Sequence, residues 1–162
     1  MFNSESLLEF CKRAHQSFGK ILDHCRSLSP EDFNREIDGF GFPTVKLQLH
    51  HTIGAQKYWL GVIEGRMDVD DDPDDNFTFD DMVAYRDSVL GITETYLSSA
   101  SPEELNSARV MTTWGNVEKE LIPAHIVIRT LCHLYHHQGQ IAAMCRSMGK
   151  PVEPGMDYPI FP

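Results

Sequence analysis

The 162-residue sequence lacks several features that would assign it at once to a class of protein. It has no run of 18 or more apolar residues, so we expect no membrane-spanning helix. Basic residues are few, and the formal net charge of −10 argues against nucleic acid as a partner. The N-terminal stretch MFNSESLLEF lacks the basic and apolar regions of a signal peptide, so we expect a cytoplasmic protein.

Several motifs of catalysis and redox chemistry are also missing. The sequence contains no GxSxG nucleophile elbow, no glycine-rich phosphate-binding loop and no CxxC pair. Cys11 and Cys25 fall on one expected helix, about 21 Å apart at 1.5 Å per residue, which is too far for a disulfide. Cys132 and Cys145 are separated similarly. We therefore expect four reduced thiols, packed mostly as small apolar groups.

What the sequence does contain is a globular composition and four long helical patterns. Hydrophobic residues make up 41% and aromatic residues 10%, as in folded proteins. Apolar residues recur at steps of three and four, which predicts helices over 4–28, 44–64, 79–99 and 123–148. Four such helices with short connections predict an all-α four-helix bundle, in which residues 1–162 form a single domain.

Smaller elements are predicted between the long helices. Ser-Pro-Glu occurs at 29–31 and at 101–103, and predicts two short helical turns that begin with a serine cap and a proline. Residues 108–123 are rich in β-forming side chains around a Gly-Asn pair, which predicts an irregular hairpin before the last helix. At the start of the first helix, Ser6 and Glu9 fit a capping box.

An acidic stretch, RMDVDDDPDDNFTFDD, carries eight aspartates within residues 68–81. Three of them occupy positions 1, 3 and 5 of an EF-hand loop. However, position 6 is Asp75 where that loop requires glycine, and position 12 is Asp81 where it requires glutamate. We interpret the stretch as an exposed acidic loop that lies away from any histidine site and supplies no ligands.

Histidines are concentrated in CHLYHHQGQ, residues 132–140. On a helical projection, His133 and His137 lie one turn apart at the edge of the apolar face, whereas His136 lies on the polar side. Two imidazoles at this HxxxH spacing can reach a single ion. An alternative one-turn pair, Cys132 and His136, straddles the polar side.

The helix predicted over 44–64 offers a third histidine. In LHHTIGAQKYWL, His51 lies at the margin of the apolar face. Three polar residues of this helix also project inward, as candidate hydrogen-bond partners for ligating imidazoles: Gln48, Thr52 and Gln56. The remaining histidines outside the HxxxH segment are expected at the surface: His15, His24, His50 and His125.

His51, His133 and His137 therefore form a candidate three-histidine metal site. Three neutral nitrogen donors hold a divalent transition metal and leave positions open for water or substrate, which is typical of a catalytic site. The alternative interpretation is that these histidines are incidental, because an HxxxH spacing also arises by chance.

The segments LHHTIGAQKYWL and HLYHHQGQIAAMCRSMG resemble the DinB-like (damage-inducible B) family of small bacterial four-helix proteins. In the family pattern, a metal-binding histidine precedes a Trp-Leu pair by eight residues, as His51 does here. The family's last helix carries HxxxH followed by Arg-Gly-Gln. Here His133 and His137 are followed by Gln-Gly-Gln, so that Gln138 stands where the family has arginine. The change affects any role of that arginine in binding an anionic substrate or an interface.

The resemblance implies a divalent transition metal on three histidines, zinc first, with nickel and iron as alternatives. It also implies a homodimer and a thiol-dependent S-transferase or a metal-dependent hydrolase. We therefore expect an enzyme whose metal activates a thiol or water toward a small-molecule substrate, with a low-molecular-weight thiol as a candidate co-substrate. No general base can be assigned from the sequence. The alternative is a non-catalytic, stress-related metal-binding or dimeric interaction module.

Overall fold

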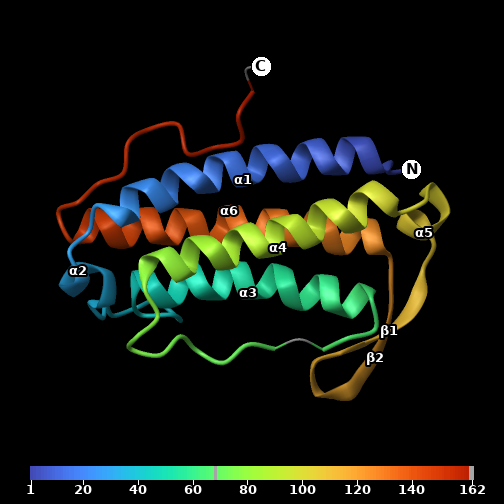
Figure 1. Ribbon diagram of the computed structural model, residues 1–162, viewed down its shortest axis with the longest axis horizontal. Helices are drawn as coiled ribbons and strands as arrows, with labels where there is room; N and C mark the ends of the chain where they lie inside the picture. Colours follow the sequence, from blue (N-terminus) through green and yellow to red (C-terminus); the bar gives the residue numbers. More distant parts are fainter. Residues whose placement is uncertain (68, 161–162) are drawn as a thin grey trace.

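The computed structural model describes residues 1–67 and 69–160. Its four long helices form an elongated bundle (Figure 1). They are α1 (Ser4–Arg26), α3 (Val45–Ile63), α4 (Phe79–Ser99) and α6 (Pro123–Ser147). Each helix begins and ends within two residues of its predicted bounds, so the all-α four-helix bundle is confirmed.

Local capping residues determine where the helices begin. The Asn3 side chain accepts a hydrogen bond from the Ser6 backbone N–H at 2.8 Å, which places the start of α1 at Ser4. The predicted capping box at Ser6 and Glu9 is therefore wrong, because asparagine is an equally good cap and occurs three residues earlier. A true capping box is present at the start of α4, between Thr78 and Asp81.

The short elements appear where they were predicted. They are α2 (Pro30–Asn34), α5 (Pro102–Asn106), and an antiparallel hairpin of β1 (Arg109–Thr113) and β2 (Val117–Leu121) joined by the turn η1 (Trp114–Asn116). In this turn Gly115 and Asn116 have φ angles of 71° and 59°. Glycine and asparagine tolerate this left-handed conformation best, which explains the Gly-Asn pair.

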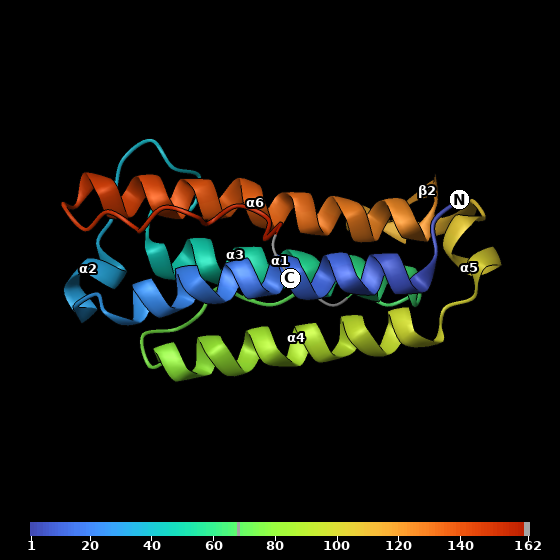
Figure 2. The ribbon, with the colours of Figure 1, turned by 90° about the horizontal axis from the view of Figure 1, so that it is seen from above.

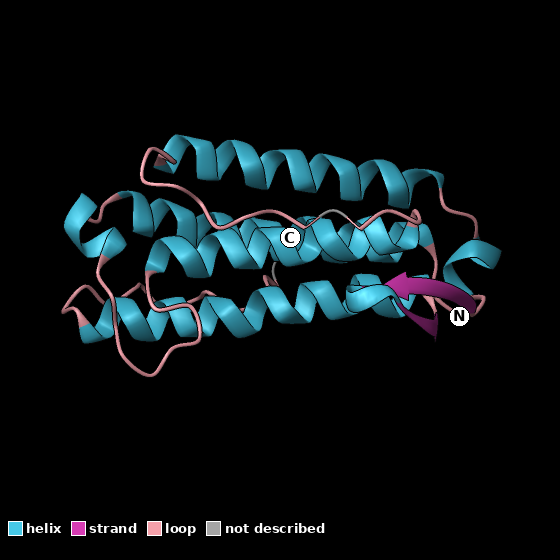
Figure 3. Cartoon of the chain, turned by 90° about the horizontal axis from the view of Figure 1, so that it is seen from below, coloured by secondary structure: helices cyan, strands magenta, loops and turns pink. Residues whose placement is uncertain are grey.

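The direction of the helices explains the longest connection in the chain. Neighbours around the bundle are α1 and α4, α4 and α3, α3 and α6, and α6 and α1, as the view from above shows (Figure 2). Helices α3 and α4 run in the same direction (Figure 1). The connection at 64–78 must therefore return along about 28 Å of α3, at 1.5 Å per helical residue. Figure 3, a view from below, shows the described parts of this connection running lengthwise along the bundle. The expectation of short connections is wrong here.

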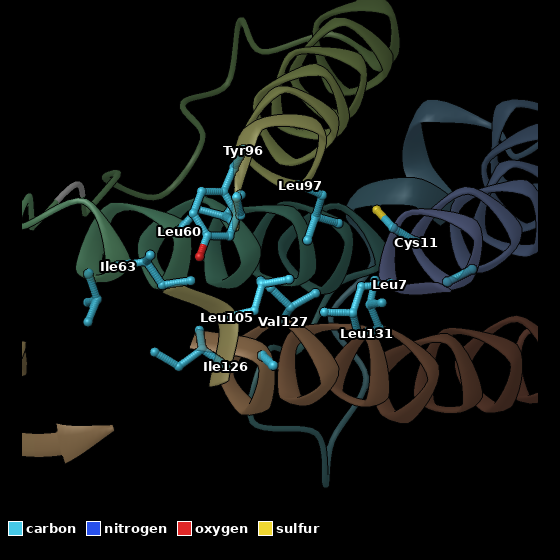
Figure 4. Packing of buried hydrophobic residues seen from close by; sticks show 14 of the residues in the cluster. Leu7, Cys11, Leu60, Ile63, Tyr96, Leu97, Leu105, Ile126, Val127 and Leu131 are labelled. Atoms are coloured by element: carbon cyan, nitrogen blue, oxygen red, sulfur yellow. The ribbon is translucent and has the colours of Figure 1, made fainter. Parts of the chain in front are cut away.

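The core runs along the bundle axis as two apolar clusters, with Leu131 in one and Leu134 in the other. Figure 4 shows Leu7, Leu97 and Val127 directed toward one another from three helices. Burying a leucine or valine side chain contributes about 1.5–3 kcal/mol. This packing fixes the helices against one another, and so fixes the positions of the side chains on the faces of α3 and α6.

A row of hydrogen-bonded polar side chains crosses this core. It corrects the predictions for His15 and Gln56. His15 was expected at the surface, but it is only 3% exposed, and its Nε2 lies 3.0 Å from the Gln56 Oε1. The Gln56 amide donates in turn to Thr93 Oγ1 at 2.8 Å, so Gln56 supports His15 and not a ligating imidazole. Burial lowers the pKa of His15 to about 4, which keeps the ring neutral at pH 7. His125 is exposed, as expected, and His24 is half-buried.

The four cysteines are all free thiols, as expected. Cys11, Cys25 and Cys145 are buried among apolar side chains, and Cys132 is exposed.

None of the helices within residues 1–67 and 69–160 is both long enough and apolar enough to cross a membrane.

Candidate metal centre

His51 on α3 and His133 and His137 on α6 come together, as the helical projections predicted. One nitrogen from each ring can be chosen so that all three lie within 4.8 Å of one another. The Nε2 atoms of His51 and His133 are 3.2 Å apart. The ring centroid of His137 lies 4.3 Å from that of His133 and 4.7 Å from that of His51. The three imidazoles thus surround one point between the two helices.

Helical spacing, helix packing and one aromatic contact position these rings. His133 and His137 project from the same face of α6 because four residues make about one helical turn. His51 faces them because α3 packs against α6. The Phe42 ring, from the loop before α3, then stacks on the His51 ring with 3.8 Å between centroids. The position of Phe42 is not predictable from the sequence, because a loop residue has no periodicity that could indicate its contacts.

Gln48 determines which nitrogen of His137 is free. The Gln48 side chain is fully buried, and its Oε1 lies 2.7 Å from the His137 Nδ1. An amide oxygen can only accept, so His137 donates from Nδ1 and keeps a lone pair on Nε2. The Gln48 amide donates to Gln140 Oε1 at 2.9 Å, and Gln140 lies 3.0 Å from the exposed His136. The prediction for Gln48 is confirmed, whereas the Thr52 hydroxyl only bonds to the Gln48 backbone carbonyl.

Burial keeps the cluster uncharged. Burial, and then the neighbouring imidazoles, lower the pKa of His133 and of His137 to about 4. Burial also lowers the pKa of His51. At pH 7 the three rings are therefore neutral, and the two Nε2 atoms of His51 and His133 face each other at 3.2 Å. Two ligands of a tetrahedral ion with metal–nitrogen distances of 2.0–2.1 Å are about 3.3 Å apart. The donor set thus fits a divalent transition metal.

A cavity of about 260 Å³ opens beside His51 and His133. Four aromatic side chains form much of its wall: Phe42, Tyr58, Trp59 and Trp114. Trp114 belongs to the hairpin turn, and its backbone N–H donates to the Tyr58 hydroxyl at 2.6 Å. This bond fixes the hairpin against α3 at the rim of the cavity.

The acidic loop forms another side of the same cavity, so the expectation that it lies away from the histidines is wrong. Asp70 and Asp72 both line the cavity. The Asp70 carboxylate is 2.5 Å from the Lys57 ammonium group and accepts a hydrogen bond from the Tyr85 hydroxyl. The aspartates are nevertheless exposed, as expected. The parallel course of α3 and α4 forces the loop to run along α3, where these partners hold it. Asp68 lies outside the described residues.

The same loop covers His50, which was expected to face solvent. His50 is 9% exposed, and its ring packs against the Phe77 and Tyr85 rings with centroids 5.4 Å and 5.1 Å away. Lys46 is also buried, and its ammonium group donates to the Asp74 carbonyl at 2.6 Å. The helical projection correctly separated His50 from the apolar face, but it could not show that a distant segment would cover the polar face.

Two other sequence features lie apart from the cluster. The buried Gln138 amide donates to Ser17 Oγ at 2.9 Å and to the Met156 carbonyl, so it faces α1 and the C-terminal tail. The departure from the family's arginine is therefore remote from the cavity. Among the described residues, the three-histidine cluster includes neither Cys132 nor His136.

The chain belongs to the DinB family, because the model of that family matches residues 1–162. A comparison with curated proteins found no match. The family assignment and the three-histidine geometry agree with the resemblance found in the sequence, and both are compatible with a metal-binding protein.

Replacing any one of His51, His133 and His137 by alanine is expected to abolish stoichiometric zinc binding. Two imidazoles would remain, which is fewer than the three protein ligands that such open sites use. Equilibrium dialysis followed by elemental analysis measures the zinc content. His136→Ala is the matched control, because His136 is the exposed neighbour of His137 and should retain full zinc content. Loss of zinc in His136→Ala with retention in His137→Ala would mean that the ligands are wrongly assigned.

Gln48→Leu is expected to weaken zinc binding by about 10–100-fold, because His137 would lose the acceptor that orients its ring. Gln48→Glu keeps an acceptor and should retain tight binding. Competition with a fluorescent chelator measures both affinities, and circular dichroism checks that each variant is folded. Equal affinities for the two variants would show that the hydrogen bond to His137 does not support the site.

Proposed function

We propose that the protein is a metal-dependent enzyme that holds a divalent transition metal on His51, His133 and His137 and activates a thiol or a water molecule. The observation that carries this proposal is the pair of neutral imidazole nitrogens facing each other at 3.2 Å, at the edge of a cavity. A set of three nitrogen ligands beside an open cavity is typical of catalytic metal sites, whereas structural sites are closed by a fourth protein ligand.

The donor set favours some metals over others. Neutral imidazoles suit zinc, nickel and iron, and they suit magnesium and calcium poorly. Zinc is our first assignment, with nickel and iron as alternatives. When bound, such a metal supplies Lewis acidity, which makes a thiol or water more acidic and therefore a better nucleophile at neutral pH.

The chain itself contributes orientation and shielding. Gln48 fixes the ring of His137, and Phe42 covers one face of the His51 ring. The aromatic wall formed by Trp59 and Trp114 offers an apolar surface for a small organic substrate. These groups would hold a substrate beside His51 and His133 and limit the access of bulk water.

Our first candidate reaction is the transfer of a low-molecular-weight thiol to a small electrophile. The thiolate sulfur would form a bond to the electrophilic carbon, and the leaving group would depart with the bonding electrons. The reducing cytoplasm, where we place the protein, holds such thiols in abundance. Hydrolysis by an activated water is the other reaction that the same site would support. The homodimer implied by the family resemblance stays a prediction.

A non-catalytic metal-binding role is the second candidate. It is favoured by the state of Asp70, the carboxylate at the cavity that would otherwise be an obvious proton acceptor. Lys57 and the Tyr85 hydroxyl both bind it, so it has little capacity to take up a proton.

Turnover by the zinc-loaded protein distinguishes the two roles. We expect it to accelerate the reaction of cysteine, glutathione or a related thiol with 1-chloro-2,4-dinitrobenzene, or the hydrolysis of p-nitrophenyl acetate, by at least about tenfold over the metal-free protein, which is about 1.4 kcal/mol of barrier. His133→Ala should lose this rate, and His136→Ala should keep it. Full zinc occupancy with no acceleration of any of these reactions would favour the non-catalytic role.

A further inference from the structure

Arg129 places a cationic side chain at the edge of the cavity. It precedes His133 by one turn of α6 and lines the cavity with it. The guanidinium carbon lies 4.8 Å from the centroid of the Trp59 ring. Within residues 1–67 and 69–160, no carboxylate forms an ion pair with Arg129. Stacking on an indole leaves the N–H edge of a guanidinium free to bind a carboxylate in a bidentate manner.

Asp72 is the corresponding anion. It lines the same cavity, and in the described part of the chain no cationic side chain pairs with it. Its neighbour Asp70 differs, because Lys57 neutralises the Asp70 carboxylate and Tyr85 binds it as well. The bonds of Asp70 also fix the loop beside Asp72, so that the free carboxylate is held at the cavity.

The side chains of Arg129 and Asp72 line the cavity from different sides of α3. Arg129 belongs to α6, which packs along one side of α3. Asp72 belongs to the loop that is bound to α3 through Lys57 and to α4 through Tyr85. Two histidines of the cluster, His51 and His133, line the same cavity. The cavity is thus lined by one arginine, by two aspartates of which Asp70 is neutralised by Lys57, by an apolar wall and by two histidines of the cluster.

This charge pattern selects among small ligands. A simple anion would meet Arg129 but also the free carboxylate of Asp72, in a protein whose formal net charge is −10. A simple cation would meet Asp72 but be repelled by Arg129. A molecule with both charges satisfies both groups, and its apolar body can lie on Trp59 and Trp114.

We propose that the cavity binds a small zwitterion, whose carboxylate contacts Arg129, whose ammonium group contacts Asp72, and whose apolar body lies on the tryptophans. The inference rests on the proposed function only in taking this zwitterion as the substrate or thiol co-substrate. The reactive part of the molecule would then lie beside His51 and His133. Arg129 and Asp72 determine specificity for charge, and they take no part in bond formation.

Binding of matched probes tests this assignment. Two zwitterions with different distances between their charges, 4-(aminomethyl)benzoate and 6-aminohexanoate, are titrated into protein that has been incubated with zinc. The single-charge analogues 4-methylbenzoate and 4-methylbenzylamine serve as comparisons. Isothermal titration calorimetry gives the Kd. Tryptophan fluorescence reports the location, because both tryptophans of the chain line the cavity. At least one zwitterion should bind about tenfold more tightly than either analogue.

Charge-removing variants identify the groups responsible. Arg129→Gln should weaken zwitterion binding by about tenfold or more and leave 4-methylbenzylamine binding no weaker. Asp72→Asn should weaken the zwitterion similarly and leave 4-methylbenzoate binding no weaker. Arg146→Gln, on the same helix, and Asp71→Asn, in the same loop, are matched controls, because both residues are exposed and neither lines the cavity.

The inference is overturned if neither zwitterion binds, if the single-charge analogues bind as tightly, or if the Arg129 and Asp72 variants behave like their controls. Zinc content is measured on the same samples. Full zinc content without zwitterion binding overturns this inference and leaves the proposed function standing. Zwitterion binding without zinc would contradict the proposed function and leave the charge assignment standing.

Discussion

The packing of α3 against α6 is the contact on which the histidine cluster depends. Leu49 and Ile53 on α3 and Leu134 and Ile141 on α6 belong to one buried apolar cluster. The buried Gln48 accepts a hydrogen bond from His137 and donates one to Gln140, and both bonds cross the same interface. Rotating α3 by the 100° that separate successive residues would carry His51 away from α6. The apolar contacts and the buried amide therefore determine together which histidine of the adjacent pair faces the cluster.

The direction of the chain contributes as much as the helix packing. Because α3 and α4 are parallel, their connection crosses the length of α3 and forms one side of the cavity. Lys57 and Tyr85 hold it there through Asp70. In a bundle with a short antiparallel connection at this point, the histidines would open directly to solvent and Asp72 would not line the same cavity as His51 and His133. The acidic segment is thus part of the site, although its carboxylates are outside the histidine cluster.

Helical periodicity was sufficient to predict the long helices, and to place His51 rather than His50, and His137 rather than His136, in the histidine cluster. It succeeds because apolar spacing directly reflects which face of a helix is buried. It fails where a residue is covered by a segment distant in sequence. His50 and Lys46 lie on the polar face of α3, and only the course of the loop buries them. His15 and Gln56 are a polar pair inside the core, and no periodicity distinguishes such a pair from surface residues.

We infer that three neutral imidazoles, and no other protein side chain, bind the metal. Zinc K-edge X-ray absorption spectroscopy of the zinc-loaded protein tests this inference most directly, because multiple scattering from imidazole rings counts the histidine ligands. We expect three imidazole nitrogens at about 2.0–2.1 Å with the remaining positions filled by oxygen from solvent. A spectrum with a sulfur ligand at about 2.3 Å, or with fewer than three imidazoles, would contradict it.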